Sequence, residues 1–344
     1  MKDIFKEKKI LVTGGTGSIG SEIVKQLLRF DINKIVVYSI DEIEQYIMSQ
    51  SLRDSRLEFI LGDVRDYRHL DSVFSQSDFD FVYHAAALKH VVMCERSPIE
   101  PVKTNIEGTQ NVIDLSVDHG VKKLLFISTD KAVYPTNVMG ATKFIAERLV
   151  LNASRYAKEG QAFSCIRFGN VANSRGSVIP VFVSNLLDNK PIIVTDRRIT
   201  RFTMNLDDAV NLILKATVLM KGGEIFIMKM KAFNLGDLVE ALQRVWKKTS
   251  GGKIRVQEMG LTLGEKLHEE LVSGLEIDDM YEMDELYVVM PHPSDPRQVG
   301  LRKAEVASYR SDGVELISTE ELGDIILECM KSKDLLRPFS SPDT

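Results

Sequence analysis

The stretch Lys9-Ile10-Leu11-Val12-Thr13-Gly14-Gly15-Thr16-Gly17-Ser18-Ile19-Gly20 decides the fold of this 344-residue chain. Its first five residues form an apolar run that predicts a short strand, and an amphipathic pattern through Phe30 predicts a helix. Gly14, Gly17 and Gly20 are spaced three apart between them, where missing side chains let the backbone approach a pyrophosphate. Because strand, loop and helix are all present, a dinucleotide site is a better interpretation than a tight turn with packing glycines.

Further apolar runs follow along the chain, and helical patterns separate them. This alternation predicts a parallel sheet. We therefore expect an α/β fold, a Rossmann-type doubly wound parallel sheet with a smaller C-terminal substrate-binding domain. The later predicted strands are residues 34–39, 57–63, 81–87, 123–128 and 164–169, and the predicted helices include residues 105–119 and 135–156.

The regular alternation weakens from about Asn170 into loops rich in Gly, Ser, Pro and Arg. We interpret this change as the start of a second, smaller domain. The predicted parts are a dinucleotide-binding domain of residues 1–169 plus 202–230, a substrate-binding domain of residues 170–201 plus 231–335, and a frayed tail of residues 336–344.

Composition excludes several classes of protein. The formal net charge of −5 gives no reason to expect nucleic acid, whose binders concentrate basic surface. Cys94, Cys165 and Cys329 are widely spaced, which predicts neither disulfides nor a zinc site, and no other metal is expected. The N-terminus is too charged for a signal peptide, and no run of about 18 apolar residues could span a bilayer. We expect a soluble, cytoplasmic protein.

Residues that follow the predicted strands complete the cofactor site. Asp63 and Val64 would suit the adenine edge, and Ala85 and Ala86 would let a cofactor lie close to the backbone, although a cap and a packing run are alternatives. The predicted cofactor contacts are Gly14, Thr16, Gly17, Ser18, Ile19, Gly20, Ser39, Asp41, Asp63, Val64, Ala85, Ala86, Lys89 and Lys143.

The residues after the second strand bear on the choice between NAD and NADP. A 2′-phosphate requires an arginine or lysine there, but the chain has Ser39-Ile40-Asp41-Glu42-Ile43-Glu44, with three acids and no base. The residues themselves therefore favour NAD.

The stretch from Ser128 to Lys143 carries the chemistry. Short-chain dehydrogenases usually have Tyr-x-x-x-Lys here, so that the lysine lowers the tyrosine pKa and the phenolate takes a proton from a sugar hydroxyl. Met139 occupies the tyrosine position, while Lys143 remains. A thioether exchanges no proton, so either catalysis is lost or Thr129, Asp130 and Lys131 perform it. For Met139 alone, filling a gap in the core is the stronger interpretation, because methionine commonly does so.

Together these segments resemble the UDP-N-acetylglucosamine 4,6-dehydratase family, extended short-chain dehydrogenases of the polysaccharide biosynthesis type. Some members have tyrosine and others methionine at the Met139 position. The family commonly has arginine at the Ile40 position and uses NADP, so the resemblance implies NADP where the residues favour NAD. The similarity spans about Lys9 to Pro291 and rests on residues 13–20, 62–66, 84–90, 128–143, 167–171, 174–180, 200–202 and 264–267.

The resemblance implies a lyase that dehydrates UDP-N-acetylglucosamine to a UDP-4-keto-6-deoxy sugar, with inversion at C5 favoured. Hydride leaves C4, water is lost across C5 and C6, and hydride returns to C6. Asp130 would protonate the departing hydroxyl, Lys131 would remove H5 and Thr129 would bind O4. Lys143 would hold the nicotinamide ribose and bias the local field. A solvated ion pair is the alternative for Asp130 and Lys131.

The resemblance also implies a nucleotide-sugar site in the smaller domain. Guanidinium groups can grip a diphosphate bidentately and a carboxylate can accept ribose hydroxyls, although surface salt bridges are an alternative. Asn105 could order the active site or merely cap a helix. The predicted substrate contacts are Lys89, His90, Asn105, Asn170, Arg175, Val178, Arg201 and Glu265.

Two other functions compete with dehydration. A nucleotide-sugar 4-epimerase shares the first hydride step but needs a base at O4 such as the missing tyrosine. A catalytically silent dinucleotide-binding protein would not need Lys131 and Lys143. We expect a UDP-sugar as the partner, no nucleic acid, no membrane segment, and a homo-oligomer of a size that the sequence leaves open.

Overall fold

The computed structural model describes residues 2–290 and 301–332 of the chain. Their contacts divide the chain into two compact units: Met1–Phe168, Asp207–Lys229 and Leu271–Ala307 form the first, and Gly169–Leu206, Met230–Glu270 and Ser308–Thr344 form the second. Each unit is described by itself below. The predicted tail of residues 336–344 lies outside the described residues.

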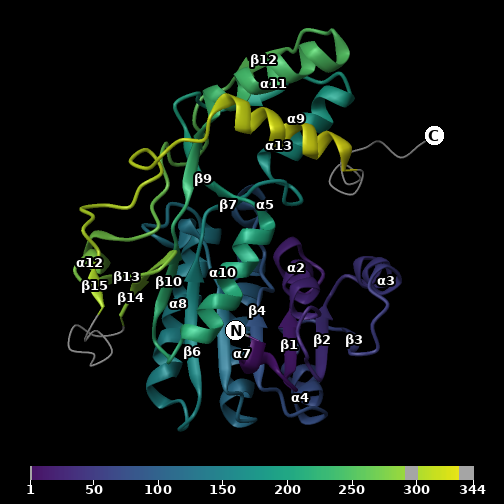
Figure 1. The fold of residues 1–344 in the computed structure, drawn as a ribbon, viewed down its shortest axis with the longest axis vertical. Helices are drawn as coiled ribbons and strands as arrows, with labels where there is room; N and C mark the ends of the chain where they lie inside the picture. Colours follow the sequence, from purple (N-terminus) through teal and green to yellow (C-terminus); the bar gives the residue numbers. More distant parts are fainter. Residues whose placement is uncertain (1, 291–300, 333–344) are drawn as a thin grey trace. The chain divides into compact units, whose positions relative to one another are not determined.

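A ten-stranded sheet forms the centre of the first unit (Figure 1). Its order is β15-β13-β14-β10-β6-β5-β4-β1-β2-β3, and the strands from β10 to β3 are parallel to one another. The strands are β1 (Lys9–Thr13), β2 (Lys34–Ser39), β3 (Leu57–Leu61), β4 (Phe81–His84), β5 (Lys123–Ile127), β6 (Ala162–Arg167), β10 (Ile225–Met228), β13 (Met280–Met283), β14 (Leu286–Val289) and β15 (Arg302–Lys303).

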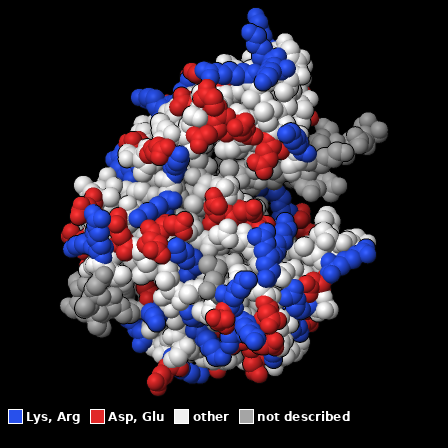
Figure 2. All heavy atoms as spheres, in the orientation of Figure 1, with Lys and Arg blue, Asp and Glu red and all other residues white. Residues whose placement is uncertain are grey.

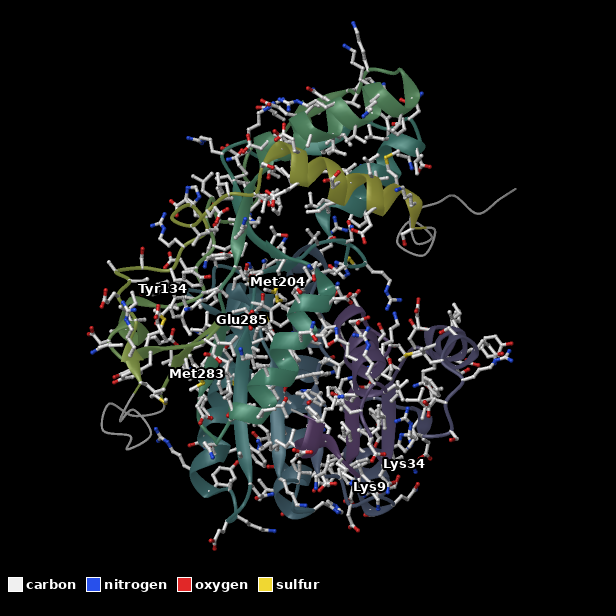
Figure 3. The ribbon with its side chains drawn as sticks, viewed as in Figure 1. Lys9, Lys34, Tyr134, Met204, Met283 and Glu285 are labelled. Atoms are coloured by element: carbon white, nitrogen blue, oxygen red, sulfur yellow. The ribbon has the colours of Figure 1, made fainter. Side chains whose placement is uncertain are left out.

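The order β3-β2-β1-β4-β5-β6 is that of a Rossmann-type doubly wound sheet, which confirms the expected fold class. Strands β1 and β2 begin in register at Lys9 and Lys34, which are labelled in Figure 3. Their apolar runs are almost entirely buried, as a parallel sheet covered on both faces requires.

Helices connect these strands. The helices of the first unit are α1 (Lys2–Phe5), α2 (Ser18–Leu27), α3 (Glu42–Ser51), α4 (Tyr67–Ser75), α5 (Val91–Arg96), α6 (Ile99–Pro101), the π-helix η1 (Val102–Glu107), α7 (Gly108–Asp118), the 3-10 turn η2 (Asp130–Ala132), α8 (Val138–Tyr156), α10 (Leu206–Leu219) and α12 (Gly274–Ile277). Helix α7 contacts α4 and α8, so these three form one layer. Gln26 on α2 donates to the carbonyl of Asp207 on α10, so these two helices also lie together.

The contact units differ from the predicted domain boundaries in two places. Residues 271–307 belong to the first unit because β14 pairs antiparallel with β10 and β13 pairs with β14. Strand β9 (Thr200–Met204) belongs to the second unit because it pairs with β11 (Lys231–Asn234) and β7 (Asn170–Val171). The functions assigned to the two domains remain predictions.

The second unit has its own apolar core beneath three helices, α9 (Val178–Leu187), α11 (Leu235–Ser250) and α13 (Thr319–Lys331). A short parallel pair, β8 (Ile192–Val194) and β12 (Val256–Glu258), packs beside α9. Residues as far apart as Ile179 and Cys329 share this core, so the C-terminal helix is an integral part of the unit.

The surface that Figure 2 shows carries basic and acidic side chains interspersed. Within the described residues, no helix is both long enough and apolar enough to cross a membrane.

Candidate active site

The sheet order brings most of the predicted site residues of the first unit to one edge. Strands β2, β1, β4 and β5 are neighbours and parallel, so the residues that follow them meet at their carboxyl ends. This edge collects the glycine loop after β1, Ser39 and Asp41 after β2, the 85–90 segment after β4, and Thr129, Asp130 and Lys131 after β5.

The glycine loop is shaped by close backbone approach. Gly14 has a φ of +64°, and a Cβ there would lie 2.6 Å from the Ala86 nitrogen and 2.8 Å from the Ala85 carbonyl carbon. Gly17 occupies the N-cap of α2 and offers no side chain to cover the first turn of the helix. Gly14 thus lets the loop pack against the segment after β4, and the uncovered first turn of α2 forms a cradle of the kind that suits a dinucleotide pyrophosphate.

The end of β2 contacts the glycine loop through hydroxyl groups. Thr16 and Ser39 share a hydrogen bond of 2.8 Å between their hydroxyls. Asp41 caps α3 by accepting from the Glu44 nitrogen at 2.9 Å. Ile40 stands between Ser39 and Asp41 and is 65% exposed.

Asp63 follows β3 and accepts two hydrogen bonds from Arg65. The Arg65 side chain donates at 2.7 Å and the Arg65 backbone nitrogen at 2.9 Å. Partial burial disfavours the charged carboxylate, but the Arg65 hydrogen bonds outweigh this effect and lower the Asp63 pKa. Val64 is buried, and the Tyr38 hydroxyl donates to the Asp63 carbonyl at 3.0 Å. Asp63 is therefore a rigid, ionised acceptor.

Asn105 orders the segment after β4. Its side-chain oxygen accepts from the Leu88 nitrogen at 2.8 Å, and its amide donates to the Leu88 carbonyl and to Thr142 on α8, both at 3.0 Å. Asn105 is 1% exposed and lies inside η1, so the helix-cap alternative is wrong. Lys89 and His90 follow as exposed residues, with His90 at the N-cap of α5.

The turn η2 gathers three of the predicted catalytic side chains. The Thr129 hydroxyl and the Lys131 amine each donate to Asp130 Oδ1 at 2.9 Å. Asp130 is 0% exposed, so the solvated ion pair considered from the sequence is wrong. Its Oδ2 is buried and has no hydrogen-bond partner among the described residues. A buried oxygen of this kind has a bond to offer to a ligand.

Helix α8 places Met139 and Lys143 beside this turn. Gly140 permits the close approach, because a Cβ there would overlap the Lys131 carbonyl oxygen. Lys143 donates to the Ile127 carbonyl at 2.6 Å and lies 4.0 Å from the centre of the Phe126 ring. Burial lowers the Lys143 pKa to about 8, against the opposing charge of Glu147.

Met139 is buried. The position where tyrosine is usual in short-chain dehydrogenases therefore has a side chain without an exchangeable proton.

The remaining predicted residues lie in the second unit. Arg201 donates to Glu265 at 3.5 Å and to the Leu267 carbonyl at 3.2 Å, and it lies 3.8 Å from Glu269. Asn170 begins β7, and Arg175 and Val178 are half-buried near the start of α9. The arginine and carboxylate predicted to bind a nucleotide are thus neighbours.

Sequence reasoning missed three hydrogen-bonded charged residues of the first unit, the buried Glu147 and Arg167 and the partly buried Glu276. Two signals could have found them. Arg167 ends an otherwise uncharged strand, and Glu147 follows Lys143 by one helical turn.

Comparisons with known proteins show which family the chain is similar to. An uncharacterized membrane protein of Methanocaldococcus jannaschii is 43% identical over 332 residues, covering 95% of this chain and 98% of the relative. The inverting UDP-N-acetylglucosamine 4,6-dehydratase of Campylobacter jejuni is 41% identical over 291 residues, covering 84% of each chain. A UDP-glucose 4-epimerase of Rickettsia akari is 36% identical over 338 residues, covering 94% of this chain and 96% of the relative.

Solved structures share the fold. The X-ray structure of Pen from Bacillus thuringiensis superposes with a TM-score of 0.87 at 39% identity, covering 94% of this chain and 98% of that one. The dTDP-glucose 4,6-dehydratase DesIV of Streptomyces venezuelae, solved with NAD bound, has a TM-score of 0.71 at 20% identity. The superposition covers 96% of this chain and 100% of that one.

A family model described as polysaccharide biosynthesis protein matches residues 10–291. That match spans the glycine loop, the turn η2 and helix α8, and it agrees with the family resemblance seen in the sequence. The chain belongs to the polysaccharide biosynthesis protein family.

Proposed function

We propose that this protein is a UDP-N-acetylglucosamine 4,6-dehydratase, a lyase that makes a UDP-4-keto-6-deoxy sugar for polysaccharide biosynthesis with inversion at C5. The observation that carries the proposal is the buried turn in which Thr129 and Lys131 converge on Asp130 while Asp130 Oδ2 lacks a partner. The 41% identity to an inverting dehydratase supports the same reaction.

A nicotinamide cofactor fits the residues of the glycine loop. The cradle at the first turn of α2 would hold its pyrophosphate, and Ser39 with Asp41 lies where its adenosine ribose would be bound. When bound, the cofactor supplies reversible hydride transfer.

The turn supplies the acid and the base for the elimination. In this proposal the pair carries one proton on Asp130, and Lys131 is neutral. Once C4 is a ketone and the O4 proton has passed to water, Lys131 would remove the acidic H5 and Asp130 Oδ2 would protonate the departing 6-hydroxyl. C5 would then take a proton from water as C6 becomes a methyl group, and the Lys131 ammonium would return its proton to Asp130 through their hydrogen bond. Thr129 binds O4, and the Lys143 ammonium favours negative charge developing nearby. Met139 contributes no proton. Lys89 and His90 contact the sugar or its phosphates in this proposal, and Arg201 and Glu265 bind the nucleotide.

Proton NMR of the purified protein with UDP-N-acetylglucosamine in deuterated water tests the proposal. We expect a new C6 methyl signal, deuterium at C5 and the inverted configuration there. Unchanged substrate in the presence of bound cofactor would contradict dehydration of this sugar.

A 4-epimerase is the second candidate, because the Rickettsia akari relative is named as one. Epimerisation changes C4 and creates no methyl group, so the same spectra distinguish the two. The higher identity to the inverting dehydratase, 41% against 36% for this relative, favours dehydration.

For the cofactor we propose NAD rather than NADP. The segment after β2 has no lysine or arginine that could bind a 2′-phosphate. It contains the exposed Ile40 and the acids Asp41, Glu42 and Glu44. We expect NAD to bind more tightly in a fluorescence titration. Ile40→Arg should improve NADP binding by roughly tenfold, the worth of one charged hydrogen bond. Tighter binding of NADP by the unaltered protein would contradict this choice.

We further propose a cytoplasmic homo-oligomer. The cytoplasm agrees with three cysteines that form no disulfide. Light scattering of the purified protein tests the oligomer, and a monomeric mass at micromolar concentration would contradict it.

A further inference from the structure

Three charged side chains form a buried cluster beside the catalytic turn: Glu147 on α8, Arg167 on β6 and Glu276 on α12. Arg167 donates to the two Glu147 oxygens at 2.8 and 2.7 Å and to the two Glu276 oxygens at 2.8 and 2.9 Å. It also donates to the Leu271 carbonyl at 3.2 Å. Glu147 is 0% exposed and Arg167 1%, whereas the Glu276 side chain, 12% exposed, lies at the outer end of the cluster.

Stability alone is a weak explanation for such a cluster. Burying charges costs solvation, and a well-packed apolar replacement of a buried ion pair is often equally stable or more so. The cluster's hydrogen bonds are directed instead at residues that hold the active site in place.

The first of these residues are at the end of β5. Ile127 accepts from the Lys143 amine at 2.6 Å, and the next residue, Ser128, donates from its hydroxyl to Glu147 at 2.5 Å. Lys143 and Glu147 are one turn apart on α8, so one helix face holds two consecutive residues of the strand. Thr129 and Asp130 follow immediately.

Strand β6 holds the turn from the other side. The Ser128 nitrogen donates to the Ile166 carbonyl at 2.8 Å, and the Asp130 nitrogen donates to the Phe168 carbonyl at 3.1 Å. Arg167 lies between these two acceptors. A shift of Arg167 would therefore move both carbonyls that support the turn.

The cluster also acts on the charge of Lys143. Burial lowers the Lys143 pKa to about 8, and Glu147 is the largest opposing influence, ahead of Cys165. Burial raises the Cys165 pKa well above its ordinary value, so that thiol is neutral. Burial and Lys143 lower the His84 pKa to about 3, so the imidazole is neutral too. Glu147, whose two oxygens accept from Arg167, is thus the buried carboxyl group that favours the ammonium form of Lys143.

We propose that Glu147, Arg167 and Glu276 are positioning residues, which align Asp130 through Ser128 and β6 and place a buried carboxyl group one helical turn from Lys143. The kinetic consequence rests on the proposed dehydratase function, whereas the effect on Lys143 does not.

Glu147→Gln tests the cluster, because it removes the charge and keeps the shape. We expect kcat to fall at least about tenfold with KM within about twofold, as for a misaligned catalytic group. The alkaline limb of the pH profile should move to lower pH. In NMR of protein labelled with carbon-13 at lysine Cε, the Lys143 signal, assigned with Lys143→Arg, should titrate at lower pH than in the unaltered protein.

Arg148→Gln is the matched control. Arg148 is exposed and contacts the same Glu276 at 3.1 Å, so its loss should leave kcat and the Lys143 titration unchanged. The proposal is overturned if folded Glu147→Gln has the kcat, pH profile and Lys143 titration of the unaltered protein.

Ser128→Ala is the second test should Glu147→Gln not fold. It keeps all three charges and removes only the hydroxyl that joins β5 to Glu147. A lower kcat with an unchanged Lys143 titration supports alignment by the cluster, and an unchanged kcat overturns it. An unaltered protein that does not dehydrate UDP-N-acetylglucosamine would defeat the proposed function, while the NMR titration would still test the cluster.

Discussion

At the scale of single residues, Lys131 is the side chain that the elimination depends on most. Lys131→Ala should lower kcat by about 10²- to 10⁴-fold, the usual contribution of a general base, while NAD still binds. Turnover assays and a fluorescence titration measure the two effects. Lys122→Ala is the control, because Lys122 is an exposed lysine of the same unit that pairs with Asp80. Appreciable turnover by Lys131→Ala would show that another group removes H5.

Sequence patterns predict the identity of such residues better than their surroundings. The motif places Thr129, Asp130 and Lys131 after a strand, and the fold confirms that position. Their convergence on one carboxylate oxygen depends on the 3-10 turn, and the burial of Asp130 depends on the packing around it. Neither follows from spacing along the chain.

At the scale of elements, the approach of α8 to the catalytic turn depends on Gly140. Gly140→Ala would place a methyl group against the Lys131 carbonyl oxygen, so the helix or the turn must shift. We expect kcat to fall by about 10²-fold, as for a displacement of about 1 Å. This loss should occur although alanine favours a helix by about 1 kcal/mol over glycine.

Ala141→Gly provides the comparison for that variant, since it weakens the helix at the next position without adding an atom. Its kcat should remain near that of the unaltered protein while its Tm falls. If Gly140→Ala kept full activity, close packing of α8 against the turn would not matter for catalysis.

The elements that the sequence predicts are those with strong local signals. Apolar runs reveal β1 to β6, and crossover rules order them. Strand β14 has an apolar run of the same kind, but its antiparallel pairing with β10, far away in sequence, does not follow from that run. Strands β13 and β15 are short and mixed in polarity, and pairing stabilises them. The π-helix η1 is likewise invisible to helical periodicity, yet it places Asn105.

At the scale of the whole molecule, the buried cluster links folding to pH. Burial disfavours the charged form of Glu276, but Arg167 outweighs it and lowers the pKa from 4.5 to about 2. A carboxyl group whose pKa is lower in the folded state stabilises the fold above its unfolded pKa, and this stabilisation is lost as pH falls. The free energy of unfolding should therefore decline between about pH 4.5 and pH 2.

Urea denaturation followed by circular dichroism measures this decline. Glu276→Gln should lower the free energy of unfolding at pH 7 and flatten its dependence on pH below about 4.5, because the titrating group is gone. Asp54→Asn is the control: Arg56 also lowers the Asp54 pKa, but that pair is partly exposed, so solvent screening should leave a smaller change in slope. Equal slopes for Glu276→Gln and the unaltered protein would mean that Glu276 gains no net stabilisation from Arg167, and that acid unfolding begins elsewhere in the molecule.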